Sequence, residues 1–412
     1  MRILVLSTIP THPPEAGNRA RILAQCAALK RAGHQVTFAL VPQEDGDLEE
    51  TARFFGDEFA LFDTEPFRPR PSIPRRLIRR FRHALGLASA YRLRLDDWHD
   101  PRTIPWLRGL HRRHQFEAVM VNYVFQSRML EAFPSDVLKV IETHDTFGDR
   151  HLSYLEAGME PEWYSTSPKE EFRGLARADV VIAIQSEEAT RFRNGVPPST
   201  RVVTVHPYME DLSAAAPCDL PRAVVVASSN IINTMGARRF LDGAFPIVRQ
   251  AIPEFELVLA GNICNHFRNE PGVVCLGRVA DLRTAYEAGA LALNPVLFGT
   301  GFCIKTLESL AYGMPLVSTT TGCRGLESVE GSGSFIVVAD DDVQGMAAAI
   351  IRVLQDPEAR SGLRDSAKRF SIEWSRQQLS TLEEVFAARE PDAEAWDRPG
   401  SNRDDTAFRR DL

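Results

Sequence analysis

The sequence predicts an α/β protein built from two parallel-sheet domains. Its 412 residues are enough for two domains of about 200 residues with separate cores. Short apolar segments typical of buried parallel strands alternate with helical segments, and this alternation occurs twice along the chain. A stretch rich in alanine and proline separates the two series. We therefore expect a first domain over residues 1–205, a hinge over 206–221 and a second domain over 222–370.

The first domain opens as a β-α-β unit. Residues 3–6 form a continuous apolar run, followed by a proline-rich loop that ends near Gly17. A helix over residues 19–32 then stops at Gly33, because glycine readily adopts the backbone conformation that ends a helix. Further strands of this domain are expected at residues 35–40, 118–122, 138–142, 180–184 and 202–205.

The second domain repeats the alternation. Helices are expected over residues 235–251 and 282–288, and strands over residues 223–227, 256–260, 273–276, 292–296, 316–318 and 334–338. Parallel strands joined by right-handed crossovers place ligands at the carboxyl ends of the strands, in the cleft between the domains. The polar, aperiodic tail over 389–412 is expected to be disordered.

Composition excludes several classes of function. The net charge of −7 gives no global basic field for nucleic acid. The six cysteines are scattered without a Cys-x-x-Cys pair, which indicates a reducing compartment and argues against a structural metal. No apolar stretch approaches the ~20 residues of a membrane span, so we expect a cytoplasmic protein without a metal or a resident cofactor.

The most informative segment runs from the strand at 292–296 to Cys323. The strand meets a Gly299-Thr300-Gly301 turn, and the helix that follows directs its N-terminal N–H groups outward. Such a helix start suits a phosphate or diphosphate. Glu308 lies about two turns into the helix and can accept hydrogen bonds from sugar hydroxyls. Residues 313–315 (Gly-Met-Pro) end the helix before the next buried strand.

This segment resembles the donor-site motif of family 4 glycosyltransferases, which are retaining enzymes of the GT-B fold that use nucleotide-activated sugars. Members of that family carry two glutamates separated by seven residues. Here the second is Glu308, whereas Thr300 stands eight positions before it. The combination of Gly-Thr-Gly, Lys305, Glu308 and Gly-x-Pro resembles a branch that lacks the first carboxylate. The alternative is an ordinary strand-turn-helix of any α/β domain.

The resemblance implies a GT-B architecture, with two Rossmann-like parallel-sheet domains facing a cleft and a helix over 371–388 crossing back to the first domain. It also implies that Glu308 accepts from both ribose hydroxyls of the nucleotide. The turn would hold the diphosphate, and the backbone near Arg278 and Val279 would read the base, although Arg278 can equally be a surface arginine. The donor-binding residues expected on the turn are Gly299, Thr300, Gly301, Phe302 and Cys303.

The chain departs from the family pattern in the residues that bind the diphosphate. The family supplies an Arg and a Lys after the first strand of the second domain, but that spacing is absent here. Asn230 and Asn233 stand in that region and can cap a helix or contact the leaving group. Lys305 can supply the missing charge through a charge-assisted contact worth ~1.5–3 kcal/mol. The alternative for Lys305 is a solvated helix lysine.

The first domain contributes candidates on the opposite side of the cleft. His144 and Asp145 follow the strand at 138–142 and resemble the family's histidine that approaches the donor sugar. A neutral imidazole can bond a sugar hydroxyl, or His144 can simply be satisfied within its loop. We assign Gly17, Asp145 and Glu142 to the acceptor side. The family's scheme of front-face attack, in which the leaving phosphate helps to deprotonate the acceptor, requires no dedicated base.

Residues 67–95 form a basic segment with nine arginines and no acidic residue. Within it, Leu77, Ile78, Phe81 and Leu85 fall on one helical face with arginines around them. A basic amphipathic helix suits an anionic membrane surface or a phosphorylated lipid acceptor. The alternative is a solvated helix packed on the first sheet.

Together these features predict a retaining, metal-independent hexosyltransferase that moves a sugar from a nucleotide diphosphate to a glycan or lipid-linked acceptor. The expected process is the assembly of surface polysaccharide or another glycoconjugate, in the cytoplasm and peripherally on the inner face of the membrane. The alternatives are a non-catalytic nucleotide-sugar scaffold or sensor, and an epimerase or phosphorylase of the same fold. We expect catalytic roles for His144 and Lys305 and donor binding by Asn233.

Overall fold

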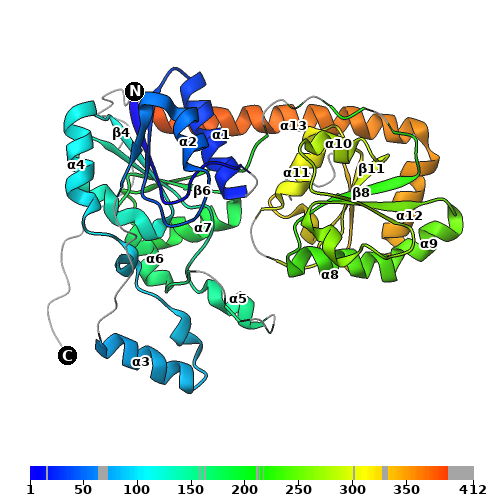
Figure 1. Ribbon diagram of the computed structural model, residues 1–412, viewed down its shortest axis with the longest axis horizontal. Helices are drawn as coiled ribbons and strands as arrows, with labels where there is room; N and C mark the ends of the chain where they lie inside the picture. Colours follow the sequence, from blue (N-terminus) through cyan, green and yellow to red (C-terminus); the bar gives the residue numbers. More distant parts are fainter. Residues whose placement is uncertain are drawn as a thin grey trace, which may run out of the picture.

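The structure is a computed structural model in which two α/β domains lie side by side and one long helix runs along both of them (Figure 1). It describes residues 1–14, 17–63, 73–156, 158, 160–161, 164–209, 212, 214–216, 218–299, 302–326 and 333–387. The expected α/β fold class with two parallel sheets is confirmed.

The first domain is built on a seven-stranded parallel sheet in the order β3-β2-β1-β4-β5-β6-β7. The order reverses between β1 and β4, which is the switch point where open parallel sheets bind ligands. Its strands are β1 (Arg2–Ser7), β2 (Gln35–Leu40), β3 (Phe59–Leu61), β4 (Ala118–Asn122), β5 (Leu138–Glu142), β6 (Val180–Ala183) and β7 (Arg201–Thr204). The short edge strand β3 has no counterpart in the predicted set.

Helices cover both faces of this sheet. They are α1 (Gly17–Arg31), α2 (Leu48–Phe55), α3 (Ile73–Ala84), α4 (Thr103–His114), α5 (Arg150–Glu156), α6 (Pro168–Leu175) and α7 (Ser186–Gly195). The described part of this domain also contains the 3₁₀ segments η1 (Gly56–Glu58), η2 (Ala88–Tyr91), η3 (Leu95–Trp98) and η4 (Val124–Ala132). Helix α3 is an exception, since Figure 1 shows it at the edge of the domain, away from the sheet.

The second domain carries a six-stranded parallel sheet in the order β10-β9-β8-β11-β12-β13. Its strands are β8 (Arg222–Val226), β9 (Glu256–Ala260), β10 (Val273–Gly277), β11 (Leu291–Asn294), β12 (Leu316–Thr319) and β13 (Ile336–Val338). The other elements are α8 (Ile231–Asp242), α9 (Ala244–Ala251), η5 (Asn262–His266), α10 (Leu282–Tyr286), α11 (Ile304–Ala311), η6 (Thr321–Cys323) and α12 (Val343–Gln355).

The helix predicted over 235–251 is in fact two helices. Gly243 ends α8 and precedes α9 in a backbone conformation outside the helical region. Pro246 then falls in the first turn of α9, where a missing N–H costs nothing. Helical periodicity continues across this break, so the apolar pattern alone did not reveal it.

Helix α13 (Pro357–Phe386) connects the two domains. It begins earlier than the expected 371, because the Asp356 side chain caps it and Pro357 occupies its first position. Its first half packs against α11, and its last turns place Leu382, Val385 and Phe386 in the core of the first domain. At the hinge, the Trp374 indole N–H donates to the carbonyl of Pro207 at 2.8 Å.

None of the helices in the described ranges combines the length and the apolar character needed to cross a bilayer. Residues 389–412, expected to be disordered, lie outside the described residues.

We predict that Phe386→Ala destabilises the first domain by about 3–5 kcal/mol, since the ring is fully buried in its core. Hydrogen exchange resolved by segment measures this as faster exchange in β1, β2 and β5. Phe54→Ala, at a ring that is largely exposed, serves as the control and should have a much smaller effect. Unchanged exchange in the first sheet of Phe386→Ala would show that α13 does not stabilise this domain.

Candidate functional site

The carboxyl ends of strands from both sheets meet between the domains. Gly17, at the start of α1, lies directly against Ile304, the first residue of α11, and a Cβ built on Gly17 would stand 2.8 Å from the Ile304 Cδ1 atom. Only a residue without a side chain therefore fits at this position without a shift of its neighbour. Gly17 thus lies where the two domains meet, and its place on the acceptor side stays a prediction.

Helix α11 is fixed on the strand ends by a buried polar pair. The Asn294 amide at the end of β11 donates to the Thr306 hydroxyl at 2.9 Å and to the carbonyl of Gly322 at 3.0 Å. The Thr306 hydroxyl itself donates to the same carbonyl at 2.6 Å. Because these groups are buried and mutually satisfied, they hold the helix N-terminus in one position at the edge of the sheet.

Glu308 is half-buried on the exposed side of α11. Its Oε1 atom accepts a hydrogen bond from the Tyr286 hydroxyl at 2.7 Å. Burial raises the pKa of Glu308, while the Tyr286 hydrogen bond and the charge of Lys305 oppose this rise. Within the described residues, no donor contacts Oε2, so one carboxylate oxygen remains for a ligand hydroxyl.

Lys305 is joined to helix α8 through Asn233. The Lys305 ammonium donates to Asn233 Oδ1, and the Asn233 amide donates to the carbonyl and the hydroxyl of Ser228 at 3.0 and 3.1 Å. Asn230, not Asn233, caps α8 with its side chain. Burial lowers the pKa of Lys305, because the surrounding protein stabilises the charged ammonium less well than water does. Lys305 is therefore not the solvated helix lysine of the alternative reading.

The turn before α11 is only partly within the described residues. Gly299 has a φ of +137°, a conformation that favours glycine, and its carbonyl accepts from the Arg324 guanidinium. Thr300 and Gly301, both expected to bind the donor, lie outside the described residues. The backbone N–H of Cys303 donates to the backbone carbonyl of Arg324 at 3.1 Å.

Phe302 and Cys303 have their side chains occupied by protein contacts. The Phe302 ring lies against His206 of the hinge and Trp374 of α13, with centroid distances of 5.8 and 6.2 Å. The Cys303 thiol donates to the carbonyl of Thr321 at 3.3 Å. Any contact of these two residues with a ligand would therefore involve their backbone.

Arg278 and Val279 follow β10 at the carboxyl end of the second sheet. Arg278 is exposed and Val279 half-buried. This is the position expected for a base-reading loop, while the exposure of Arg278 leaves the surface alternative open.

His144 follows β5, at the carboxyl end of the first sheet. Its φ of +61° is rare for a residue other than glycine, and its ring stacks on Tyr123 at 4.4 Å. The Nε2 atom lies 2.7 Å from Asn122 Oδ1, and the Asn122 amide donates to the carbonyl of Leu6. Oδ1 can only accept, so the proton is on Nε2 and Nδ1 is an acceptor. Burial, and secondarily the charge of Arg21, holds the His144 pKa well below its usual range, so the ring is neutral.

The structure corrects the assignment of Glu142 to the acceptor side. Its carboxylate is fully buried and accepts from Arg21 Nε at 2.9 Å and from the Gln25 amide at 2.6 Å. Both donors belong to α1, because the last side chain of β5 points to the face of the sheet that α1 covers. Glu142 thus stabilises the packing of α1 on the sheet.

A cavity of about 440 Å³ is lined on one side by Asp145, the residue that follows His144. Its walls come from the loop after β5, from α5, from α7 and, across the cleft, from Arg324. Its charged and polar lining residues are Asp145, Thr146, Asp149, Arg150, Ser153, Gln185, Glu187, Glu188, Arg191 and Arg324. Asp145 forms an ion pair with Arg150, and Arg191 lies 3.4 Å from Glu171. The cavity is therefore polar and carries both signs of charge.

Sequence reasoning missed Glu188, Arg191 and Arg324. Glu188 is 4% exposed, and within the described part of the chain its carboxylate accepts from the Gln185 amide at 3.2 Å and from the Ile184 N–H at 3.4 Å. Position along the chain could have indicated Glu188, because it follows the end of β6 as Asp145 follows the end of β5. Among the described residues, no three His, Cys, Asp or Glu side chains gather closely enough to hold a metal ion.

Comparison with known proteins agrees with this geometry. The family model described as "Glycosyl transferase 4-like domain" matches residues 16–208, and the model "Glycosyl transferases group 1" matches residues 221–356. A protein described as an uncharacterised 44.6 kDa protein in the cps region of Klebsiella pneumoniae is 24% identical over 180 residues. That match covers 40% of this chain and 45% of the relative, so it spans less than half of the length of either protein.

Solved structures resemble the chain over nearly its full length. Sucrose-phosphate synthase from Thermosynechococcus elongatus has a TM-score of 0.64 at 16% identity and covers 94% of this chain and 98% of its own. Anabaena HepE, solved in complex with UDP, has a TM-score of 0.60 at 16% identity. The match covers 93% of this chain and 100% of the HepE chain. These similarities show the GT-B fold, and the two family models together match most of the chain. The chain belongs to the group 1 glycosyltransferases.

Proposed function

We propose that the protein transfers a sugar from a nucleotide diphosphate sugar to an acceptor, with retention of configuration and without a metal ion. The observation that carries this proposal is the pairing of Lys305 and Glu308 on α11, whose N-terminus abuts the first domain at Gly17. A cation and a helix N-terminus suit the diphosphate, and the Glu308 carboxylate, about one turn into α11 and not the two turns expected from the sequence, suits the ribose. The HepE structure with UDP supports a nucleotide donor of this kind.

Three features replace a metal ion in the proposed reaction. The positive end of α11 and the ammonium of Lys305 both favour the negative charge that develops on the departing diphosphate. Lys305 is held close to that helix end by Asn233, and the turn containing Thr300 and Gly301 is proposed to bind the same phosphates. Because the Lys305 charge is partly buried, its interaction with an anion is stronger than it would be in water.

In the proposed reaction, the acceptor attacks the same face of the sugar from which the diphosphate leaves, and the anomeric configuration is therefore retained. The acceptor oxygen forms its bond to the anomeric carbon as the bond to the diphosphate breaks, and the acceptor proton passes to a phosphate oxygen of the leaving group. Neutral His144 presents Nδ1 as an acceptor and can hold a donor-sugar hydroxyl. Asp145 lines the cavity beside it and is proposed to face the acceptor.

We propose a glycan or a lipid-linked saccharide as the acceptor, bound in the cavity between α5, α7 and Arg324. The polar lining suits hydroxyl-rich ligands. Similarity to a protein of a cps region supports a role in surface polysaccharide assembly. The proposed location is cytoplasmic and peripheral on the membrane, through the basic segment 67–95, of which residues 67–72 lie outside the described residues.

A non-catalytic scaffold or sensor that binds nucleotide sugars is the second candidate. It is favoured by the absence of the family's Arg–Lys pair after β8, where this chain has Asn230 and Asn233. Loss of one electrostatic group costs about 10²–10³ in rate rather than all of it. We propose that Lys305, which donates to Asn233 in this region, supplies the missing charge, and we therefore favour an enzyme over a scaffold, and over an epimerase or phosphorylase.

Donor binding can be tested without knowing the acceptor. A nucleotide sugar at about 100 times its Kd should stabilise the protein by ~2.7 kcal/mol, seen as a thermal shift in the presence of EDTA. Lys305→Ala should weaken binding by about 10- to 100-fold, because it removes a charge-assisted contact. Glu308→Gln, which can still accept from Tyr286, should weaken it by loss of charge.

Lys169→Ala is the matched control for Lys305→Ala, since this exposed lysine on α6 belongs to the first domain and lies outside the described site. It should leave the thermal shift unchanged. A shift that requires a divalent cation, or that survives in both Lys305→Ala and Glu308→Gln, would contradict the proposed donor site.

Stereochemistry tests the proposed mechanism. Proton NMR of the first-formed product, with water as the slow acceptor when no other is known, should show the anomeric configuration of the donor. An inverted product would exclude front-face transfer. Donor binding without any turnover across an acceptor panel would favour the scaffold.

The pH dependence of stability reports on Glu188 in the acceptor cavity. Burial, together with the charge of Asp145, raises the pKa of Glu188 from 4.5 to about 8. The neutral acid is therefore the stable form in the folded protein. Its contribution to stability is complete below pH 4.5 and is lost as the pH rises toward 8, because ionisation then takes place in a buried site.

We predict that the free energy of unfolding of the wild type falls relative to Glu188→Gln between about pH 5 and 8, by up to ~1.4 kcal/mol per pH unit. Urea titrations at several pH values measure this difference. Glu187→Gln changes an exposed neighbour on the same helix and should show no such trend. Parallel curves for wild type and Glu188→Gln would mean that Glu188 is ionised at neutral pH.

A further inference from the structure

Helix α3 leaves its apolar face uncovered. Successive helical residues turn by about 100°, so Leu77, Ile78, Phe81 and Leu85 share one face. The structure leaves these four side chains between 52 and 67% exposed. The helix therefore does not pack on the first sheet, which was the alternative to a membrane role. Large apolar side chains gathered at one place on a surface mark an interaction site.

Arginines occupy the surface of α3 beside and behind its apolar face. Arg79, Arg80 and Arg82 are exposed, and the sequence from 67 to 95 contains no acidic residue in a protein of net charge −7. An apolar face bordered by arginines matches the interface of an anionic bilayer, where acyl chains and phosphate headgroups lie within a few ångströms of each other. An apolar protein partner would not account for the surrounding arginines.

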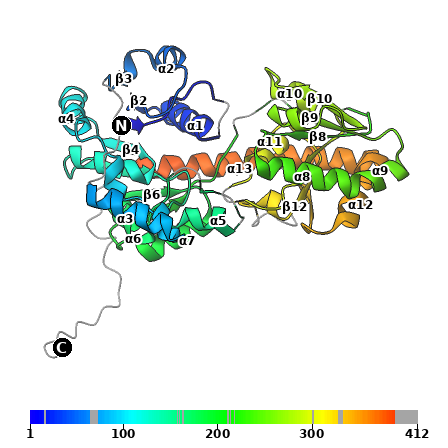
Figure 2. The same cartoon turned by 60° about the horizontal axis from the view of Figure 1, so that its bottom comes forward.

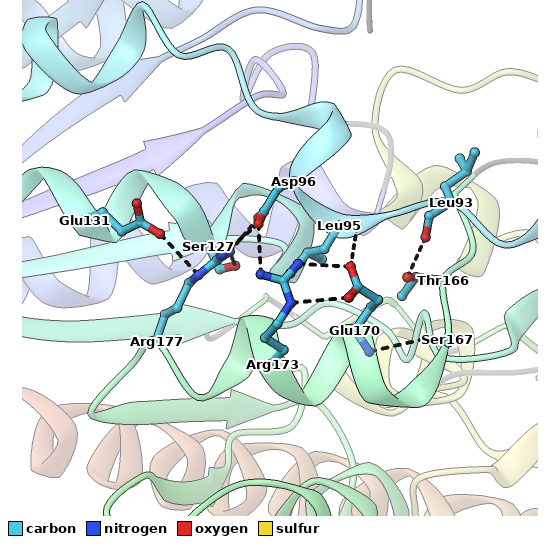
Figure 3. A network of polar contacts seen from close by, with 10 residues as sticks. All are labelled: Leu93, Leu95, Asp96, Ser127, Glu131, Thr166, Ser167, Glu170, Arg173 and Arg177. Atoms are coloured by element: carbon cyan, nitrogen blue, oxygen red, sulfur yellow. Dashed lines mark hydrogen bonds and ion pairs between the residues drawn. The ribbon is translucent and has the colours of Figure 1, made fainter. Parts of the chain in front are cut away.

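The segment after α3 is fixed to the domain by a polar network (Figure 3). Asp96 of η3 accepts from Arg173 at 2.8 Å and from Arg177 at 2.7 Å. Burial opposes the ionisation of Asp96, but hydrogen bonds from these two arginines outweigh it and lower its pKa to about 2. The Leu95 N–H donates to Glu170 at 3.2 Å, in the same network. Helix α3 is thus followed by a rigid support.

The same segment connects α3 to the wall of the acceptor cavity. The His83 ring lies 5.3 Å from the Tyr91 ring, which in turn lies 6.2 Å from the ring of His151 in α5. The Arg92 guanidinium donates to Asp149 at 2.7 Å, and Asp149 lines the cavity. Figures 1 and 2 both show α3 and α5 on the same side of the first domain.

We propose that α3 docks on an anionic bilayer and thereby turns the α5 side of the cleft toward the lipid. The inference rests on the proposed function and extends it, because it assigns the orientation of the active site and the source of the acceptor. The acceptor would be a saccharide carried on a lipid, entering the cavity past α5 from the membrane. Arginines on the cavity wall, Arg150 and Arg191, suit the phosphate of such a lipid.

Vesicle flotation of the full chain tests the docking without any nucleotide. The protein should bind vesicles of phosphatidylcholine mixed with phosphatidylglycerol, and bind phosphatidylcholine alone far more weakly. Substitution of Arg79, Arg80 and Arg82 by Ser should weaken binding about fivefold per arginine, or on the order of 100-fold in total. The same triple change at Arg108, Arg112 and Arg113 of α4 removes equal charge from another exposed helix surface and should have little effect.

The apolar contact is tested by Phe81→Asp, which should weaken vesicle binding on the order of tenfold or more. Leu220→Asp, at an exposed leucine of the hinge region, is its control. Phe81→Asp should keep the nucleotide-sugar thermal shift of the wild type, so that loss of docking is distinguished from loss of the donor site. Equal loss in both arginine triples, or equal binding to neutral vesicles, would overturn the proposal.

Hydrogen exchange on vesicles tests the orientation. Bound vesicles should slow exchange in α3 and in α5, and should leave α4 and α9 unchanged. Protection of α4 or α9, or of α3 without α5, would overturn the assignment of the α5 side of the cleft to the membrane.

Discussion

Helix α13 packs its first half against α11 and buries Phe386 in the core of the first domain. Helix α13 thus adds a second chain connection between the two domains beside the hinge. Each sheet can present residues only at the carboxyl ends of its own strands, so neither alone can surround a donor and an acceptor. The relative position of the domains is therefore the constraint on which the cleft depends. Trp374 and Phe302 pack together with His206 at the point where hinge, α13 and donor turn meet.

The electrostatics of the cleft follow from partial burial. Removal from water lowers the pKa of Lys305 and of His144 and raises that of Glu308 and Glu188. Each of these shifts reflects a group whose charged form is poorly compensated by the protein. A nucleotide diphosphate would supply the anion that Lys305 lacks, and ribose hydroxyls would supply donors to Glu308. Lys305 would gain a counter-charge from the anionic ligand proposed above.

Much of the fold could be predicted, because buried parallel strands are short and continuously apolar and glycines mark the ends of helices. The errors had local causes. The break at Gly243 is invisible to periodicity, and the edge strand β3 is too short to produce a clear pattern. Glu142 was assigned to the acceptor side because it ends a strand. Its partners, Arg21 and Gln25, lie more than a hundred positions away in sequence, so no local pattern could reveal that the carboxylate is buried.

The sequence by itself determined the α/β class, the strand, turn and helix around Glu308 and the amphipathic pattern of α3, since these depend on spacing and on local backbone preferences. Tertiary structure alone decided which groups meet. It joined Lys305 to Asn233, Glu308 to Tyr286 and Glu188 to the cavity of Asp145, and it left the apolar face of α3 uncovered. The physical reason is that burial and pairing depend on neighbours brought together by folding, whose sequence separation carries no signal within a single chain.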